Sequence, residues 1–499
     1  MKKRISLLLA VILLLSFTAV VADQHVPANP KYVFFFIGDG MSNPHTTAAQ
    51  YYLGTKLNPE SKTPVMELIS FAKFPILGQI FSFDVTSFAP DSSSTATAMA
   101  SGKRTLSASV NVGIKEGEKG LEPNADDPYK LVTEYAKEAG MKIGVISSVS
   151  LDHATPASFY SKSAKRSAYY DIALQGLGGQ TLDFLGGGGL LQPTGSNKDQ
   201  KDLFEIAKEN GFTFFNTNEE IRAIGPDSGR VLAISPELRD SQAMEYEIDR
   251  LAGGGANLSL AEMTAAGIRN LESNEKGFFM MVEGGKIDWA AHANDVVTLM
   301  YDVYALADAV DEAVAFAQKH PEDTLIVVTG DHETGGLSIG YALTAYTVHM
   351  EYLQQQKLSY VAMDGLLKDL IAKQATFDEI MDVIKENYGL TREEGLPLSL
   401  GAQEVARLSA AYTFGMLPSD LRKGVTGPDE QLHYGSYNPM SVTACHILAN
   451  KAGINFSSFS HTGLSLPVYA MGAGSELFSG TYENTDIFVR FMKAMGLSE

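Results

Sequence analysis

The chain has 499 residues, of which 45% are apolar and 20% are charged, and its formal net charge is −20. This length is too great for one small module and is ample for a large buried core. The negative charge repels nucleic acids and anionic membranes, so we expect no nucleic-acid partner, and local cations must attract any phosphate substrate.

The first segment of the chain has the pattern of a signal peptide. Cations at residues 2–4 precede an apolar run over residues 5–21, and Ala22 ends a Val-x-Ala sequence that suits signal peptidase. We therefore predict a signal peptide over residues 1–22, export to the periplasm or the exterior, and no stable membrane span after cleavage. An uncleaved anchor is the alternative, although the run is at the short edge of a membrane span.

Short apolar runs along the chain predict buried strands. Each is four to eight residues long and rich in Val, Ile or Phe. In chain order they are Tyr32–Ile37, Lys142–Val149, Phe278–Val282, Thr324–Thr329 and Pro467–Ala470. Helical patterns lie between them, for example over Leu131–Ala139 and Val296–His320. This alternation predicts an α/β fold, a three-layer sandwich around a largely parallel central sheet.

The segment over residues 341–440 has a different pattern, because it contains no clear buried strand. Helical patterns cover Tyr346–Gln355, Tyr360–Lys373 and Phe377–Asn387. Strand-like sequence resumes afterwards, so we predict a helical insertion into a catalytic domain made of residues 30–340 and 441–499. A lid over the active site and a simple extension of the core are alternative roles for this segment.

Acidic and imidazole side chains follow the predicted strands. Asp39, Glu283 and the pair Asp331–His332 each follow a strand directly, and His153 and Thr155 lie just past another. Ligands bind beyond the carboxyl ends of strands in open parallel sheets, so we expect these side chains to meet at one edge.

A further pair, Asp288 and His292, is spaced four residues apart. On a helix both side chains point the same way and can bind one metal ion, although a single pair of this kind is more often capped or solvated. Clustered carboxylates without cations would raise one another's pKa values. Carboxylate and imidazole ligands without thiolates suit zinc, with oxygen-rich sites for magnesium.

Residues 91–98 have the sequence Asp-Ser-Ser-Ser-Thr-Ala-Thr-Ala, which predicts the start of a helix that runs to about Ser101 and stops at Gly102. Ser92 at this position is either a helix N-cap or a nucleophile. Beside a metal cluster the second role is favoured, because helix-end N–H groups and a metal ion both stabilise an alkoxide.

These motifs resemble those of the alkaline phosphatase family, from about Lys31 to the C-terminus apart from the inserted segment. The motifs stand in the family's order, and they are Gly38-Asp39-Gly40-Met41, Asp91-Ser92, His153-Ala154-Thr155-Pro156-Ala157, Glu283-Gly284-Gly285-Lys286-Ile287-Asp288 with His292, Thr329-Gly330-Asp331-His332-Glu333-Thr334, and His461-Thr462-Gly463.

The resemblance implies a centre of two Zn²⁺ and one Mg²⁺ around Ser92 as the nucleophile. The implied ligands are Asp288, His292 and His461 for one zinc, Asp39, Asp331, His332 and Ser92 for the other, and Asp39, Glu283 and Thr155 for magnesium. Arg166 stands where the family places the arginine that binds phosphate in a bidentate fork, with a structural salt bridge as the alternative. A homodimer is also implied, with the insertion reaching the partner subunit.

Two positions depart from the pattern of some relatives. His153 stands where some members place Asp beside magnesium, which could weaken magnesium binding or favour another metal, with contact only through water. Trp289 stands where other members carry Lys or His near the phosphate, which removes a possible cation.

The implied activity is hydrolysis of many small phosphate monoesters through a phosphoserine. A diesterase, sulfatase or phosphate mutase of the same superfamily is one alternative, although Ser92 lacks the Pro-x-Arg context of sulfatases. A non-catalytic protein that binds phosphate or metal is another, and it predicts a damaged nucleophile or missing ligands.

Overall fold

The computed structural model describes residues 29–417, 420–422 and 426–498. The predicted signal peptide, residues 1–22, lies outside the described residues. Over the described ranges, no helix combines the length and the apolar character that crossing a membrane requires.

A ten-stranded sheet forms the centre of the molecule, in the order β16-β2-β15-β10-β1-β9-β5-β6-β8-β7. The predicted runs form its contiguous middle, which consists of β15 (Leu466–Gly472), β10 (Thr324–Gly330), β1 (Tyr32–Gly38), β9 (Phe278–Gly284) and β5 (Lys142–Ser147). Strand β1 pairs in parallel with both β9 and β10, and β5 pairs in parallel with β9. The largely parallel α/β fold is confirmed, while β15 runs antiparallel to β10.

The outer strands extend the sheet on both sides. On one side β2 (Ile76–Phe81) pairs antiparallel with β15 and parallel with β16 (Gly480–Glu483). On the other side three strands continue the parallel arrangement, namely β6 (Phe184–Gly187), β8 (Arg230–Ile234) and β7 (Phe212–Phe215).

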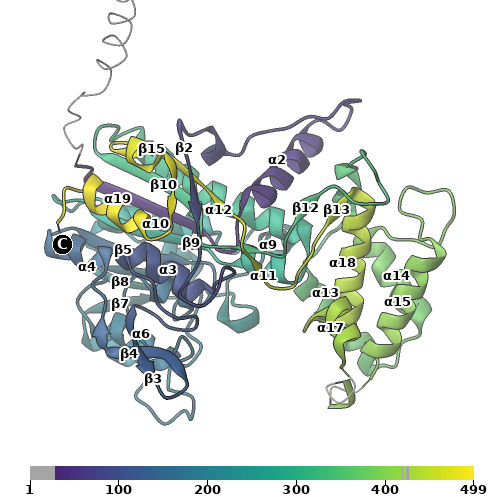
Figure 1. The fold of residues 1–499 in the computed structure, drawn as a ribbon, viewed down its shortest axis with the longest axis horizontal. Helices are drawn as coiled ribbons and strands as arrows, with labels where there is room; N and C mark the ends of the chain where they lie inside the picture. Colours follow the sequence, from purple (N-terminus) through teal and green to yellow (C-terminus); the bar gives the residue numbers. More distant parts are fainter. Residues whose placement is uncertain (1–28, 418–419, 423–425, 499) are drawn as a thin grey trace, which may run out of the picture.

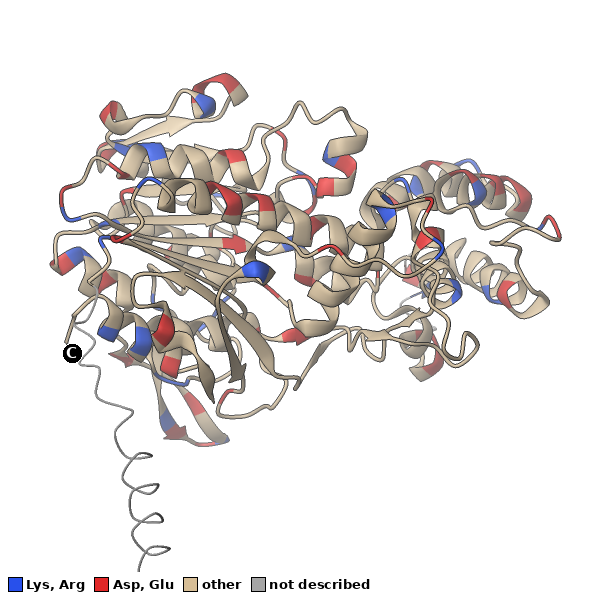
Figure 2. Cartoon of the chain, turned by 90° about the horizontal axis from the view of Figure 1, so that it is seen from above, with Lys and Arg blue, Asp and Glu red and all other residues tan. Residues whose placement is uncertain are grey.

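Helices cover both faces of the sheet. Along β1, Phe34 and Phe36 pack into one apolar core, and Val33, Phe35 and Ile37 pack into a second. Successive side chains of a strand point to opposite faces, so the two cores lie on either side of the sheet. The first core includes α10 (Leu260–Leu271) and α12 (Val296–Ala317), and the second includes α4 (Val132–Glu138), α6 (Tyr169–Gly178) and α19 (Asp486–Ala494). Most charged residues lie on the helices and loops around the sheet (Figure 2).

The segment predicted as an insertion forms a group of helices to one side of the sheet (Figure 1). It contains η4 (Met350–Gln355), α13 (Tyr360–Ala372), α14 (Phe377–Tyr388), α15 (Ala402–Gly415) and α17 (Pro428–Tyr434), and it is followed by α18 (Pro439–Ala452). The strands that flank it, β12 (Ser338–Ile339) and β13 (Ile454–Asn455), pair antiparallel. The division into a catalytic domain over residues 30–340 and 441–499 and an insertion over residues 341–440 stays a prediction.

Candidate metal centre and active site

Three central strands end side by side at one edge of the sheet. Gly38, the last residue of β1, is in register with the last residues of β9 and β10. The chain turns sharply after β1 at Gly40, whose φ is +72° and whose added Cβ would lie 2.9 Å from the Asp288 backbone. Only glycine adopts this backbone at so close an approach without strain. Asp39, Glu283 and Asp331 therefore meet at this edge.

The first ligand group consists of Asp39, Asp331 and His332, whose ligating atoms lie within 4.8 Å of one another. His332 Nε2 is 3.2 Å from Asp39 Oδ1 and 3.3 Å from Asp331 Oδ2. Asp331 is held in place because its Oδ1 accepts a hydrogen bond from the Gly40 amide at 3.0 Å and its Oδ2 accepts one from Thr95 at 2.9 Å. All three ligating side chains are buried.

The second group combines Asp288, His292 and His461. Helix α11 (Lys286–His292) places His292 Nε2 3.4 Å from Asp288 Oδ2, and His292 Nε2 is 3.1 Å from His461 Nε2. Both imidazoles have Nδ1 at 2.6 Å from a backbone carbonyl oxygen, that of Phe459 for His292 and of Pro90 for His461. A proton on Nδ1 leaves the Nε2 lone pair free for a metal ion.

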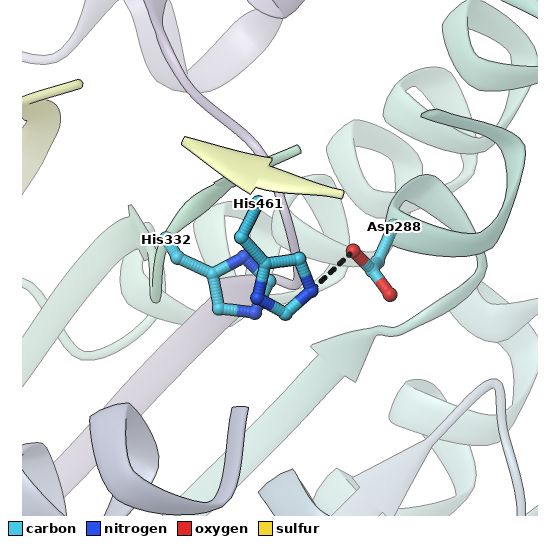
Figure 3. A group of neighbouring side chains, drawn as sticks. All are labelled: Asp288, His332 and His461. Atoms are coloured by element: carbon cyan, nitrogen blue, oxygen red, sulfur yellow. Dashed lines mark ion pairs between the residues drawn. The ribbon is translucent and has the colours of Figure 1, made fainter. Parts of the chain in front are cut away.

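His332 lies closer to this second group than the sequence indicated. One ring nitrogen of His332 lies within 4.8 Å of a carboxylate oxygen of Asp288 and of a ring nitrogen of His461. The His332 and His461 rings stack with centroids 3.6 Å apart, and His461 Nε2 is 3.7 Å from Asp288 Oδ1 (Figure 3). The two groups therefore adjoin through His332.

The third group consists of Asp39, Glu283 and His153, with Thr155 beside it. The three ligating atoms lie within 4.8 Å of one another, and Thr155 donates to Asp39 Oδ2 at 3.4 Å. Ser147 donates to one oxygen of Glu283. Glu283 Oε1 and His153 Nδ1 are both buried and have no hydrogen-bond partner among the described residues. Buried polar atoms rarely lack a partner, so these two atoms fit a site that receives a cation.

The pKa values of the buried acids and imidazoles also fit sites that receive cations. Burial raises the pKa of Asp39 well above its usual value, and Asp331 and Asp288 raise it further. Burial also raises the pKa of Glu283 to about 7, while it lowers that of His332 to about 4 and so keeps this imidazole neutral. Burial lowers the pKa of His292, but the Asp288 carboxylate more than offsets it and raises that pKa to about 9. Divalent cations would relieve the repulsion among these carboxylates.

Ser92 is the first residue of helix α3 (Ser92–Ser101), which ends at Gly102 as predicted. The N-cap alternative for Ser92 is wrong, because Asp91 is the cap and its Oδ1 accepts a hydrogen bond from the Ser94 amide at 3.1 Å. Ser92 Oγ instead lies 3.2 Å from His332 Nε2 and 3.4 Å from Asp39 Oδ1. The hydroxyl is thus part of the ligand cluster at a helix N-terminus, where an anion is stabilised.

Arg166 reaches the same place from the loop after α5 (Ala154–Ala157). Its Nη1 is 2.8 Å from Asp91 Oδ2, and its Nη2 is 3.4 Å from His153 Nε2. Burial opposes ionisation of Asp91, but Arg166 lowers its pKa to about 2. The structural salt bridge therefore exists, and its partner, Asp91, is the residue directly before Ser92.

Sequence reasoning assigned no role to Lys286, which the structure buries completely beneath Trp289. Its Nζ is 2.9 Å from Asp240 Oδ1, 3.5 Å from the ring centroid of Tyr246 and 5.4 Å from that of Trp289. Trp289 in turn stands edge-on to His153, with ring centroids 5.8 Å apart. A lysine directly after Gly-Gly at the end of an apolar strand was the available signal, because a buried ammonium needs a partner. A buried amino group paired with Asp240 therefore lies near the indole of Trp289.

Comparisons with known proteins agree with this arrangement. The family model "Alkaline phosphatase" matches residues 30–497. Two proteins of Bacillus subtilis (strain 168), alkaline phosphatase 3 and alkaline phosphatase 4, are 29% and 28% identical, and the alignments cover 93% of this chain and 89% and 88% of theirs.

Solved structures show the same fold. The alkaline phosphatase of Thermus thermophilus superposes with a TM-score of 0.74 at 25% identity, covering 97% of this chain and 95% of that one. That of the Antarctic bacterium TAB5 superposes with a TM-score of 0.59 at 25% identity, covering 94% and 99%.

Proposed function

Since this chain belongs to the alkaline phosphatase family, whose members are metal-dependent phosphomonoesterases, we propose that it hydrolyses many small phosphate monoesters through a phosphoserine at Ser92. The observation that carries the proposal is the position of Ser92 Oγ, within 3.4 Å of both Asp39 and His332. No other nucleophile is needed, because this hydroxyl lies against the ligand groups.

Carboxylate and imidazole donors without thiolates support a centre of zinc and magnesium ions. We propose that Asp288, His292 and His461 hold one zinc, that Asp39, Asp331, His332 and Ser92 hold the second, and that Asp39, Glu283 and Thr155 hold magnesium with His153 beside it. When bound, the metal ions supply the positive charge that stabilises the entering and leaving oxygens.

The chain's own residues position the ester and its phosphate. Ser92 Oγ loses its proton and attacks phosphorus, so that an O–P bond forms and the alcohol leaves as its alkoxide, which takes up a proton. Arg166 donates two N–H groups to the equatorial oxygens while Asp91 holds its other side. A water molecule then attacks phosphorus and gives up a proton, the bond between phosphorus and Ser92 Oγ breaks, inorganic phosphate leaves, and Oγ takes up a proton.

The direction of departure follows from the positions of the two groups. Ser92 lies against Asp39 and His332, and the attacking and leaving oxygens of an in-line displacement stand on opposite sides of phosphorus. We therefore propose that the leaving oxygen faces Asp288, His292 and His461.

Rates on three substrates test the class of reaction. A phosphomonoesterase hydrolyses an aryl phosphate far faster than a bis-aryl phosphate or an aryl sulfate. Preference for the bis-aryl phosphate would favour the diesterase alternative, and preference for the sulfate would favour the sulfatase alternative. No turnover of any of them by metal-loaded protein would favour a non-catalytic binding protein.

Replacement of Arg166 by alanine is expected to lower kcat/KM for an aryl phosphate roughly 10- to 100-fold, because charge-assisted hydrogen bonds to the phosphate are lost. Arg166→Lys should recover only part of this, since lysine cannot form the fork. Steady-state kinetics and inhibition by inorganic phosphate measure both effects. Lys165→Gln removes a neighbouring exposed cation and is the matched control. Equal losses in the control and in Arg166→Ala would contradict the assignment.

Replacement of His153 by aspartate is expected to strengthen Mg²⁺ binding at the third group, because Mg²⁺ prefers oxygen ligands. A relative offers support, since structures of the TAB5 enzyme with a histidine replaced by Glu or Asp have Mg bound in the M3 site. The Mg²⁺ concentration for half-maximal activity should fall at least about tenfold, with His433→Asp, on exposed α17, as the control. An unchanged Mg²⁺ dependence with a raised KM would mean that the new carboxylate pairs with Arg166 instead.

Export and self-association complete the proposal. We propose that residues 1–22 are removed on export to the periplasm or the exterior, and that the mature chain forms a homodimer. N-terminal sequencing of the secreted protein and sedimentation of the purified protein test these two points separately.

A further inference from the structure

A groove of about 830 Å³ lies beside the second ligand group, between His292 and the inserted helices. Its walls include Arg407 of α15, His446 of α18, Tyr437 and Asn455. The loop before His461 completes the wall with Ser457, Ser458, Phe459 and Ser460.

His292 is common to the groove and the metal centre. Its Nε2 faces His461 at 3.1 Å, while its Nδ1 is 2.6 Å from the carbonyl oxygen of Phe459, another wall residue. The groove therefore begins at the ring that faces the leaving oxygen. An alcohol that departs on this side has the groove next to it.

The groove has a distinct charge within a strongly acidic protein. Arg407 is the only Lys, Arg, Asp or Glu among the wall residues, and no hydrogen bond or ion pair joins its side chain to the described part of the chain. Burial, with help from Arg407, lowers the pKa of His446 to about 4, so this imidazole is neutral. Its Nε2 is 2.8 Å from Asn294 Oδ1, and the Asn294 amide donates to the carbonyl oxygen of Ser458.

We propose that this groove binds the alcohol portion of the phosphate monoester and favours alcohols that end in an anionic group. The inference rests on the proposed function, because it assigns the groove to the leaving group of that reaction. An unpaired guanidinium among uncharged walls attracts one anionic group, while the acidic remainder of the surface repels it. The favoured substrates would carry a carboxylate or a second phosphate at a distance from the reacting one.

Two matched series of alkyl phosphates test the proposal, one ending in methyl and one in carboxylate, with increasing chain length. For metal-loaded protein, we divide kcat/KM of each carboxylate substrate by that of the methyl substrate of the same length. This ratio should rise to at least about fivefold at the chain length that reaches Arg407. Arg407→Gln should abolish this rise and Arg407→Lys should keep part of it. Lys373→Gln removes an exposed cation of the same insertion outside the groove and should change nothing.

A second variant tests the groove as a space. Ser436→Trp, at an exposed wall position, should lower kcat/KM for the long substrates of both series and spare methyl phosphate. The same ratio in wild type and Arg407→Gln at every length would overturn the proposal, as would an equal loss in Lys373→Gln. If a groove variant changes the sedimentation of the protein but leaves the kcat/KM ratio unchanged, the groove would instead be a contact surface for a second copy of the chain. If wild type hydrolyses no monoester at all, the proposed function fails; if methyl phosphate is hydrolysed without the ratio, only the groove assignment fails.

Discussion

Replacing Ser92 with alanine should lower kcat for an aryl phosphate at least about 100-fold, because one catalytic group commonly contributes that much. The loss should not be total, since the cationic centre and Arg166 still bind the ester and water can attack directly. Wild-type protein quenched in acid during turnover should carry phosphate on the peptide that contains Ser92, and the variant should carry none. Mass spectrometry of the digested protein measures this together with the rate.

The neighbouring serine provides the control for this experiment. Ser93 Oγ donates to Asp91 Oδ2 at 2.6 Å and makes no hydrogen bond to a predicted metal ligand. Ser93→Ala should therefore lose less than about tenfold in kcat, the range of one ordinary hydrogen bond. Near-normal turnover of Ser92→Ala, or a label that disappears only in Ser93→Ala, would reject Ser92 as the nucleophile.

Removal of the metal ions with a chelator should abolish turnover and destabilise the protein, increasingly so as the pH rises. Burial raises the pKa of Glu283 from 4.5 to about 7 in the metal-free fold, and Asp39 is raised as well. An acid with a raised folded pKa favours the fold when protonated, so this contribution is lost as the pH rises from about 4.5 to about 7. The loss for Glu283 alone is roughly 3 kcal/mol.

The measurement compares unfolding of the metal-loaded and metal-free protein across that pH range. The difference between their midpoints should widen with pH, because protons and metal ions compete for the same oxygens. Trp289 is the only tryptophan and lies at the site, so its fluorescence also reports metal removal directly. Glu283→Gln should remove the part of the widening that comes from Glu283, and the part that comes from Asp39 should remain. A difference that stays constant with pH would contradict the role of these acids.

The centre of the sheet was predictable because its strands are continuous apolar runs. The outer strands were not, for local reasons: β6 is Phe-Leu-Gly-Gly, and β7 exposes two of its four residues. Glycines give no buried-strand pattern, and the Phe-Thr-Phe-Phe sequence of β7 is apolar but only four residues long, with Thr213 and Phe214 exposed. The antiparallel direction of β15 depends on the connection through the inserted segment, which local sequence does not specify.

Candidate ligands could be predicted from the sequence where they directly follow a strand or are spaced four residues apart on a helix. The resemblance supplied His461 and Arg166, which no local pattern marks. The Lys286 contact was unpredictable because its partner, Asp240, precedes two non-glycine residues with positive φ, Ser241 and Gln242, in a loop distant in sequence. The groove likewise depends on how α15 and α18 pack, so no single sequence motif predicts it.

The ligand groups draw on six separate stretches of chain, from Asp39 to His461. No two of these stretches can offer a complete set of donors until the sheet between them has assembled. A metal ion therefore cannot template the early collapse of this chain, as zinc does in small domains whose ligands are adjacent. The protein therefore binds the ions late in folding, after the segments most distant in sequence have come together. The rate of metal uptake by a refolding sample would report the rate of the last folding step.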